Sequence, residues 1–195
     1  MNSQLVAAQD LDTFLEDLRL AAAETPGEAE LVSFMLFTRQ FFSRYPLDEL
    51  AGRYLSDVFG KVYHCWRLIQ VYNGTSPLIQ LINPRLDTEG WSCPHTILTI
   101  LQKDMPFLVD SIRIELNRRN IAIHAIKSTV LSVQRDSEHK LLSLEPPANV
   151  DVNKEAFVYV EINLLTFRNE LADIVQSLQS VLAELSCVVG DYQPM

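Results

Sequence analysis

The sequence predicts an α+β fold, in which a helical segment precedes a domain of antiparallel strands and two helices. Two observations lead to this expectation. Residues 10–72 place apolar side chains at helical spacing, interrupted at Pro26-Gly27 and Tyr45-Pro46. From Leu78 onward, short runs rich in Ile, Val, Leu and Thr are typical of strands, and two runs of helical spacing separate them. We therefore expect a helical segment over residues 1–76 and an α+β domain over residues 77–195.

Three helices and one short helical turn are expected in the first segment. The first helix begins near Asp10, the second follows Gly27, a helical turn covers 47–51, and Ser56 is the expected N-cap of the third helix. The apolar residues that share a face within these helices are Leu11, Phe14, Leu15, Leu18, Leu31, Phe34, Met35, Phe41 or Phe42, Phe59, Val62, Tyr63, Trp66 and Ile69.

The second segment is expected to contain five strands and two helices. The strands cover 78–83, 95–102, 121–134, 140–144 and 157–164, and one helix follows Asp104 while the other follows Thr166. The polar stretch 145–154 contains two prolines and is expected to be a loop. The helical residues expected to face the core are Phe107, Leu108, Ile112 and Leu116 in the first helix, and Phe167, Leu171, Ile174, Val175, Leu178, Leu182 and Leu185 in the second.

The order of these elements from His95 is βαββα, with a hairpin between the second and third strands. This is the order of the ferredoxin-like split βαβ fold, in which both helices lie on one face of an antiparallel sheet. Its closing strand would follow Gly190, where only residues 191–195 remain, so we expect that strand to be very short or absent. Because an unclosed sheet leaves backbone groups unpaired, a homo-oligomer is expected.

Composition excludes several classes of partner. The net charge of -9 and pI of 4.9 disfavour nucleic acid, because phosphate recognition needs an excess of Lys and Arg. The N-terminus has no signal peptide, and no apolar run approaches the roughly 18 residues that span a bilayer, so no membrane is expected and the protein is placed in the cytoplasm. Three distant cysteines, Cys65, Cys93 and Cys187, indicate reduced thiols rather than disulfides.

The sequence lacks the motifs that are typical of dinucleotide, phosphate and zinc sites and of serine nucleophiles. The six glycines are too far apart for a dinucleotide-binding turn or a P-loop, so no cofactor site is expected. His64-Cys65 and Cys93-Pro94-His95 have no second pair of ligands at zinc spacing, so no metal site is expected. No G-x-S-x-G motif is present, and no catalytic residues are assigned. His95 and His124 are interpreted as structural histidines.

The segment 81–130 resembles a known family of proteins. It contains "DMPFLVDS" at 104–111 and resembles the N-terminal region of the large NAD-specific glutamate dehydrogenases of bacteria. The residues that carry the resemblance are Asn83-Pro84, Gly90-Trp91, His95-Thr96, residues 104–111, Glu115-Leu116-Asn117-Arg118 and His124. Weaker similarity extends upstream to Tyr45-Pro46 and downstream to residues 191–195.

The resemblance implies a helical lead-in followed by the first ACT-like domain of a very long polypeptide. The full-length enzyme of that family deaminates L-glutamate oxidatively to 2-oxoglutarate with NAD, and its dehydrogenase core lies far beyond this region. The resemblance therefore implies NAD for the full-length enzyme, no catalysis by residues 1–195 alone, and the downstream domains of the same polypeptide as partners.

The turn between the expected first strand and helix of the ACT-like domain is the candidate site for an effector or an interface. ACT domains commonly carry Asp-x-Pro-Gly there, and regulatory members bind an amino acid beside it. Here Phe107 replaces the glycine, which obstructs close approach of a ligand, so we favour an architectural turn in which Phe107 packs in the core or against a neighbouring domain. Asp104 suits the N-cap and Pro106 an early helical position. The candidate residues are Asp104, Met105, Pro106, Phe107, Asp110 and Ser111.

Three functions remain as hypotheses. The first is a noncatalytic regulatory or assembly module of a glutamate dehydrogenase, and the second is an amino-acid-sensing ACT-type domain that uses the candidate turn. The third is a ferredoxin-like RNA-binding module, for which Phe157 and Tyr159 in "KEAFVYVEIN" are the candidate stacking aromatics, although Glu155 stands where that motif has glycine.

Overall fold

The computed structural model describes residues 4–7, 10–22, 25–43, 45–147 and 152–191. The chain divides into two compact units, which are described separately. The helical unit comprises residues 1–70 with 84–93, and the α/β unit comprises residues 71–83 with 94–195. Residues 192–195, where the closing strand was expected to be short or absent, lie outside the described residues, as do 148–151 of the expected loop.

The helical unit contains α1 (Leu11–Ala21), α2 (Glu28–Phe42), a 3-10 helix η1 (Leu47–Leu50) and α3 (Leu55–Leu68). Asp10 caps α1, because its carboxylate accepts a hydrogen bond from the Thr13 backbone N–H at 3.0 Å. The expected cap at Ser56 is wrong, since α3 begins at Leu55 and its N-cap, Tyr54, makes no side-chain cap bond. Aromatic rings fill the core of this unit, with the largest fully buried side chains being Trp66, Phe14, Phe34, Phe37 and Phe42.

The loop 84–93 belongs to the helical unit because it packs on α3. A Cβ atom placed on Gly60 would lie 2.4 Å from Trp91, so only glycine allows this approach. The backbone N–H of Ser92 also donates to Asp57 Oδ1 at 2.8 Å. Trp91, one of the residues on which the family resemblance rests, thus packs directly against Gly60.

The α/β unit is built on a five-stranded antiparallel sheet with the strand order β1-β2-β5-β3-β4. The strands are β1 (Leu78–Ile82), β2 (Thr96–Lys103), β3 (Ile123–Arg135), β4 (Leu141–Leu144) and β5 (Asn153–Ile162). The predicted end of the loop 145–154 is wrong, because β5 already starts at Asn153. There the strand is extended by pairing with the long β3, from Val133 opposite Asn153 onward.

Strand β1 occupies the edge of the sheet beside β2. In the split βαβ fold the closing strand lies against the first strand, which is β2 here. Instead of a strand from the C-terminal end, β1 pairs with β2 in antiparallel register from Leu78 opposite Leu101 to Ile82 opposite Ile97. The expectation of an unpaired edge at β2 is therefore wrong. The edge is filled by a segment that precedes β2 in the chain.

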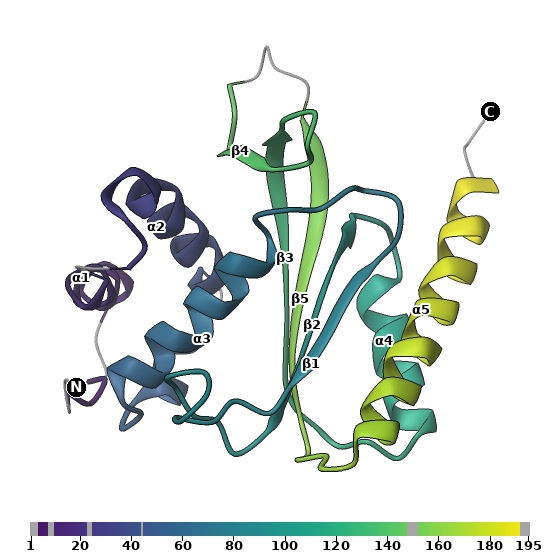
Figure 1. Cartoon of the computed structure of the whole chain (residues 1–195), viewed down its shortest axis with the longest axis horizontal. Coiled ribbons are helices and arrows are strands. Elements are labelled where there is room, and N and C mark those ends of the chain that lie inside the picture. The colour runs from purple at the N-terminus through teal and green to yellow at the C-terminus, as the bar shows by residue number, and fades with distance from the viewer. Residues whose placement is uncertain (1–3, 8–9, 23–24, 44, 148–151, 192–195) are drawn as a thin grey trace. The chain divides into compact units, whose positions relative to one another are not determined.

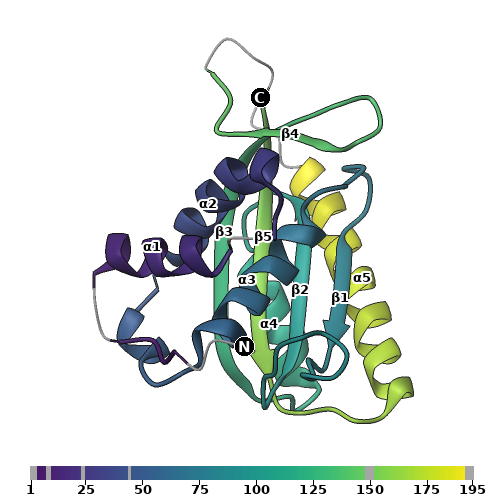
Figure 2. The ribbon, with the colours of Figure 1, turned by 60° about the vertical axis from the view of Figure 1, so that its left-hand side comes forward.

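Helices α4 (Leu108–Arg118) and α5 (Arg168–Asp191) lie on one face of the sheet, as Figures 1 and 2 show. This agrees with the predicted α+β class and with the predicted order of elements. The buried residues that join sheet and helices include Leu98, Ile100, Val158, Val160, Ile112, Leu116, Ile174, Leu178 and Leu182. Two predicted core residues are wrong, since Phe107 is 68% exposed and Phe167 is 73% exposed.

By length and composition α5 could also cross a membrane, over Arg168–Gly190. The expectation that no such apolar run exists was therefore too strict. Ile174, Leu178 and Leu182 of this helix are buried in the core on the sheet, whereas only 17% of its apolar stretch is buried.

Candidate functional site

The candidate turn differs from its expected geometry. Helix α4 begins at Leu108, and its N-cap is Phe107, with no side-chain cap bond. Asp104 therefore does not cap the helix, and Pro106 lies before it. Instead, the Asp104 backbone N–H donates to the Lys154 carbonyl at 2.9 Å and continues the pairing of β2 with β5 beyond the end of β2.

Phe107 adopts the left-handed backbone conformation, with φ 64° and ψ 5°. Glycine takes this conformation without strain, whereas a residue with a Cβ loses roughly 1 kcal/mol. The Phe107 backbone thus keeps the conformation that suits the glycine of the ACT motif. Its side chain points to solvent, so the prediction of core packing is wrong, and packing against a neighbouring domain stays a prediction.

A cavity of about 340 Å³ lies beside this turn. Its walls come from the segment 72–77, the end of β2 with the start of the turn, and the last turns of α5. Of the six predicted site residues, Asp104 and Met105 line the cavity. Pro106, Phe107, Asp110 and Ser111 are not among its lining residues; Pro106 and Asp110 are exposed and Ser111 is half-buried.

The residue that sequence reasoning missed is Gln102. It lines the cavity, is 2% exposed, and neither its Nε2 nor its Oε1 atom has a hydrogen-bond partner. A buried amide without partners is unfavourable, and neither of its two polar atoms is reached by solvent from the open cavity. The signal in the sequence was one glutamine at the end of the apolar strand "TILTILQK".

A second cavity, of about 320 Å³, is lined by polar residues around Arg135 and Glu155. Arg135 donates from Nε and Nη2 to the two oxygens of Glu155, both at 2.7 Å, and both side chains are almost fully buried. The guanidinium also lies 5.7 Å from the centre of the Tyr72 ring. Burial, reinforced by the Glu155 charge, raises the pKa of Tyr72. This ion pair joins β3 to β5. Because each charged group is already paired with the other, we interpret the pair as structural.

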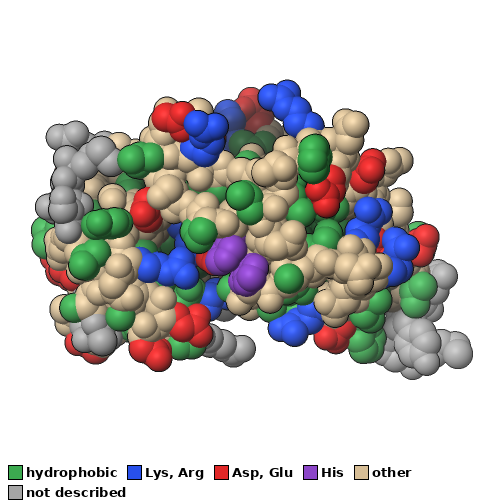
Figure 3. Space-filling model, turned by 90° about the horizontal axis from the view of Figure 1, so that it is seen from below, with side chains coloured by type: hydrophobic (Ala, Val, Ile, Leu, Met, Phe, Trp, Pro, Cys, Tyr) green, Lys and Arg blue, Asp and Glu red, His purple; other side chains and the backbone are tan. Residues whose placement is uncertain are grey.

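At the other end of the sheet, His95 and His124 stack with ring centres 4.2 Å apart and planes 16° apart. His95 Nδ1 lies 3.1 Å from Glu161 Oε2, and the Tyr159 hydroxyl donates to Glu161 Oε1 at 2.9 Å. Figure 3 shows histidine side chains side by side on the surface. A coordinated metal lies in the plane of its imidazole, so two stacked rings cannot bind one ion together. The structural interpretation of both histidines stays a prediction.

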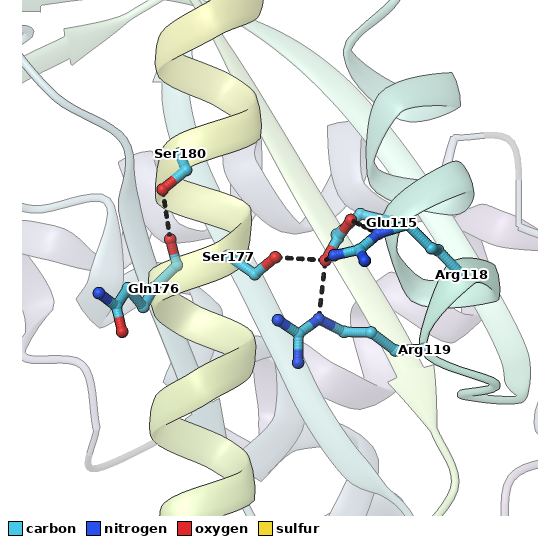
Figure 4. A network of polar contacts seen from close by, with 6 residues as sticks. All are labelled: Glu115, Arg118, Arg119, Gln176, Ser177 and Ser180. Atoms are coloured by element: carbon cyan, nitrogen blue, oxygen red, sulfur yellow. Dashed lines mark hydrogen bonds and ion pairs between the residues drawn. The ribbon is translucent and has the colours of Figure 1, made fainter.

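A buried carboxylate, Glu115, links α4 to α5 (Figure 4). It accepts hydrogen bonds from Arg118 at 2.8 Å, from Arg119 at 2.7 Å and from the Ser177 hydroxyl. These donors, Arg118 foremost, lower the pKa of Glu115 to about 2. The Ser177 bond joins α5 to α4, and the Glu115 carboxylate is buried and fully engaged by these donors.

Phe157, Tyr159 and Cys65 are buried, whereas Cys93 is half-buried and Cys187 is exposed. Phe157 and Tyr159 are each 1% exposed, so the stacking surface that an RNA-binding module needs is missing from these two residues. Cys65 is fully buried, and burial raises the pKa of its thiol, which disfavours a reactive thiolate.

Comparison with known proteins identifies the family. The family model described as "Glutamate dehydrogenase, ACT1 domain" matches residues 37–178. The chain belongs to this family. The match spans the sheet, α4 and residues 168–178 of α5, and it includes α3 of the helical unit.

Two relatives of this ACT1 chain are named NAD-specific glutamate dehydrogenase. The protein from Pseudomonas aeruginosa is 38% identical over 184 residues, which cover 93% of this chain and 11% of the relative. The protein from Halomonas elongata is 38% identical over 161 residues, which cover 82% of this chain and 10% of the relative. The chain therefore spans about a tenth of the length of these relatives and corresponds to their N-terminal region. No solved structure matches it significantly.

Proposed function

We propose that this ACT1 chain is a noncatalytic regulatory or assembly module at the N-terminus of a large NAD-dependent glutamate dehydrogenase. The observation that carries the proposal is the family match over residues 37–178, in a chain that corresponds to about a tenth of relatives named for that activity. In the proposed full-length enzyme, L-glutamate, NAD and water give 2-oxoglutarate, ammonium and NADH, and NAD binds outside this chain.

The residue chemistry supports the noncatalytic part of the proposal. In the part of the chain that the structure describes, the buried carboxylates Glu115 and Glu155 are paired with arginines, and Glu161 binds His95 and Tyr159. None of these groups is placed as a free general base beside a cavity. Partners on this proposal are the downstream domains of the same polypeptide and a second copy of the chain, in the cytoplasm.

The test is an assay for NAD reduction with L-glutamate, using residues 1–195 and the long polypeptide side by side. We expect NADH formation by the long polypeptide and none by residues 1–195. Glutamate-dependent NADH formation by residues 1–195 would overturn the proposal. Light scattering of residues 1–195 tests self-association, and a monomeric mass at high concentration contradicts that part.

The amino-acid-sensing function is a second candidate, and one observation favours it. Asp104 and Met105 of the candidate turn line a cavity of about 340 Å³, together with Gln102. The RNA-binding alternative has no comparable support, because its two aromatic residues are buried.

A further inference from the structure

The segment before β1 contains an Asn-Gly pair, Asn73-Gly74, and the sequence has no other. We propose that Asn73 is a modification site, at which the chain deamidates itself through a succinimide and replaces a neutral amide by a carboxylate. The observations that carry the proposal are the exposure of Asn73 and the hydrogen bonds that hold its side chain. The proposal does not rest on the proposed function, because it concerns only this chain and water.

The reaction takes place between neighbouring backbone and side-chain atoms. The Gly74 backbone nitrogen loses its proton to hydroxide and attacks Asn73 Cγ, which forms a C–N bond and a tetrahedral intermediate. The intermediate expels Asn73 Nδ2, which takes up protons from solvent and leaves as ammonia, so a five-membered succinimide remains. Water then opens the ring at either carbonyl and breaks one C–N bond, which gives aspartate or isoaspartate. One water is consumed and one ammonia is released, and no group is oxidised or reduced.

The attacking and the leaving nitrogens are accessible and are not held by hydrogen bonds. Asn73 is exposed, and Gly74 is half-buried but has no Cβ atom to crowd the attack. Within the described residues, neither the Gly74 N–H nor Asn73 Nδ2 donates a hydrogen bond. Neither nitrogen therefore has to give up a bond within the protein before it reacts.

The carbonyl oxygen of the Asn73 amide, by contrast, is bound twice. Its Oδ1 atom accepts from the Thr75 backbone N–H at 3.0 Å and from the Thr75 hydroxyl at 2.9 Å. Because a backbone N–H can only donate, the oxygen and not the nitrogen of the amide faces Thr75. Negative charge develops on this oxygen during the attack, and two donors already directed at it stabilise that charge.

Lys103 adds a positive charge beside this segment. A Cβ atom built on Gly74 would lie 3.7 Å from Lys103 Cε, and the Lys103 side chain is exposed. A nearby cation favours both the anionic intermediate and the carboxylate product over the neutral amide. Asn73 lines the cavity of about 320 Å³ together with Lys103, so deamidation would add a negative charge to the wall of that cavity.

The first experiment incubates folded residues 1–195 at pH 6 and at pH 9 and follows the products by peptide mapping with mass spectrometry. We expect Asn73 to gain the mass difference between an amide and a carboxyl group, faster at pH 9 because the attacking nitrogen must lose its proton. Asn120 is the internal control, since it is also exposed but precedes the branched Ile121, whose N–H donates to the Leu116 carbonyl at 3.0 Å. Absence of conversion at Asn73 in the folded chain, or equal conversion at Asn120, overturns the proposal.

The second experiment tests whether the hydrogen bonds to Asn73 promote the reaction. Thr75→Val removes the hydroxyl donor and should slow conversion of the folded chain by about 2- to 10-fold, the range for one hydrogen bond of ordinary strength. Ser76→Ala is the matched control, because it also removes an exposed hydroxyl but one that does not bind Asn73. It should keep the full rate. In urea both variants should react as fast as the unsubstituted chain, and equal rates of the two variants when folded contradict the role of Thr75.

A third measurement identifies the modified residue by its charge. The product should elute with Asn73→Asp on anion exchange or carry an isoaspartyl group that an isoaspartyl methyltransferase labels. Asn73→Gln should stay unmodified under the same conditions, because its longer side chain would have to close a six-membered ring. If the acidic species forms equally in Asn73→Gln, the modified residue lies elsewhere and the proposal is wrong.

Discussion

A buried polar residue lies at each end of β2, and one has hydrogen-bond partners while the other has none. Thr96 and Gln102 stand on the same face of the strand, and both are almost fully buried. The Thr96 hydroxyl donates to Asn83 Oδ1 at 2.6 Å and accepts from the Leu165 backbone N–H at 2.9 Å. Asn83 Nδ2 in turn donates to the Leu165 carbonyl at 2.7 Å. Gln102 makes none of these bonds.

The difference is between a buried polar group that is hydrogen-bonded within the protein and one that is not. At the Thr96 end the donors meet acceptors within the protein, so the network joins the residue after β1, the start of β2 and the segment between β5 and α5. At the Gln102 end the same kind of group is buried without a partner. Replacing each polar residue by an apolar one of similar shape should therefore change stability in opposite directions.

The largest effect is expected for Thr96→Val. Valine keeps the shape of threonine but leaves the half-buried Asn83 Oδ1 without its donor and the buried Leu165 N–H without its acceptor. We expect a loss of about 2–3 kcal/mol in the free energy of unfolding, measured by urea denaturation.

The control for Thr96→Val is Thr99→Val, the same substitution on the same strand. Because the Thr99 hydroxyl has no partner, its removal should leave stability unchanged or raise it slightly. Equal destabilisation by the two substitutions would show that the cost comes from β2 itself and not from the Thr96 network.

The next effect concerns Glu115, a third buried polar group, which is fully paired. Glu115→Gln keeps the shape but removes the charge that binds Arg118 and Arg119, and Arg118 is largely exposed. We therefore expect a modest loss of about 1–2 kcal/mol at pH 7.

The pH dependence of stability gives Glu115 a separate test. Its pKa falls from about 4.5 to about 2 on folding, so the folded state holds the proton less tightly than the unfolded state. The stabilisation is complete above pH 4.5 and is lost as the pH falls through this range toward 2. Urea denaturation at pH 5, 4 and 3 should therefore show a smaller decrease for Glu115→Gln than for the unsubstituted chain. Parallel curves would contradict the assigned pKa.

A smaller effect of opposite sign is expected for Gln102→Met without ligand. Methionine fills the same space and removes a buried amide that has no partner, so stability should rise by about 1 kcal/mol. If Gln102→Met instead destabilises the chain as Thr96→Val does, the Gln102 amide stabilises the folded chain, and the two ends of β2 do not differ.

Periodicity in the sequence was sufficient to predict the helices and strands, because apolar spacing reports directly which face of an element is buried. The bounds differ from the predicted ones by a few residues, most at β5, where pairing with β3 extends the strand to Asn153. The position of β1 could not be predicted from the split βαβ order, since that order assigns the edge of β2 to a strand that comes later in the chain.

The candidate site was only partly predictable. The turn motif led to Asp104 and Met105, which line the cavity, but the partners of a buried group lie far away in the sequence. Asn83 and Leu165 are 82 residues apart, and Glu115 and Ser177 are 62 apart. Whether Gln102 has a partner depends on such distant contacts, so no local pattern distinguishes it from Thr96.

The smallest effect is expected at the turn beside the cavity, for Phe107→Gly. The positive φ of 64° strains phenylalanine, and its exposed side chain contributes little packing, whereas glycine adopts this backbone freely. Relief of strain outweighs the greater freedom of glycine in the unfolded chain, so stability should rise by about 0.5 kcal/mol. Asn120→Gly is the control, because Asn120 has a similar φ of 56° and asparagine tolerates it. Its substitution should change urea denaturation less, and if Phe107→Gly destabilises the chain, the Phe107 side chain has a packing role that its exposure does not reveal.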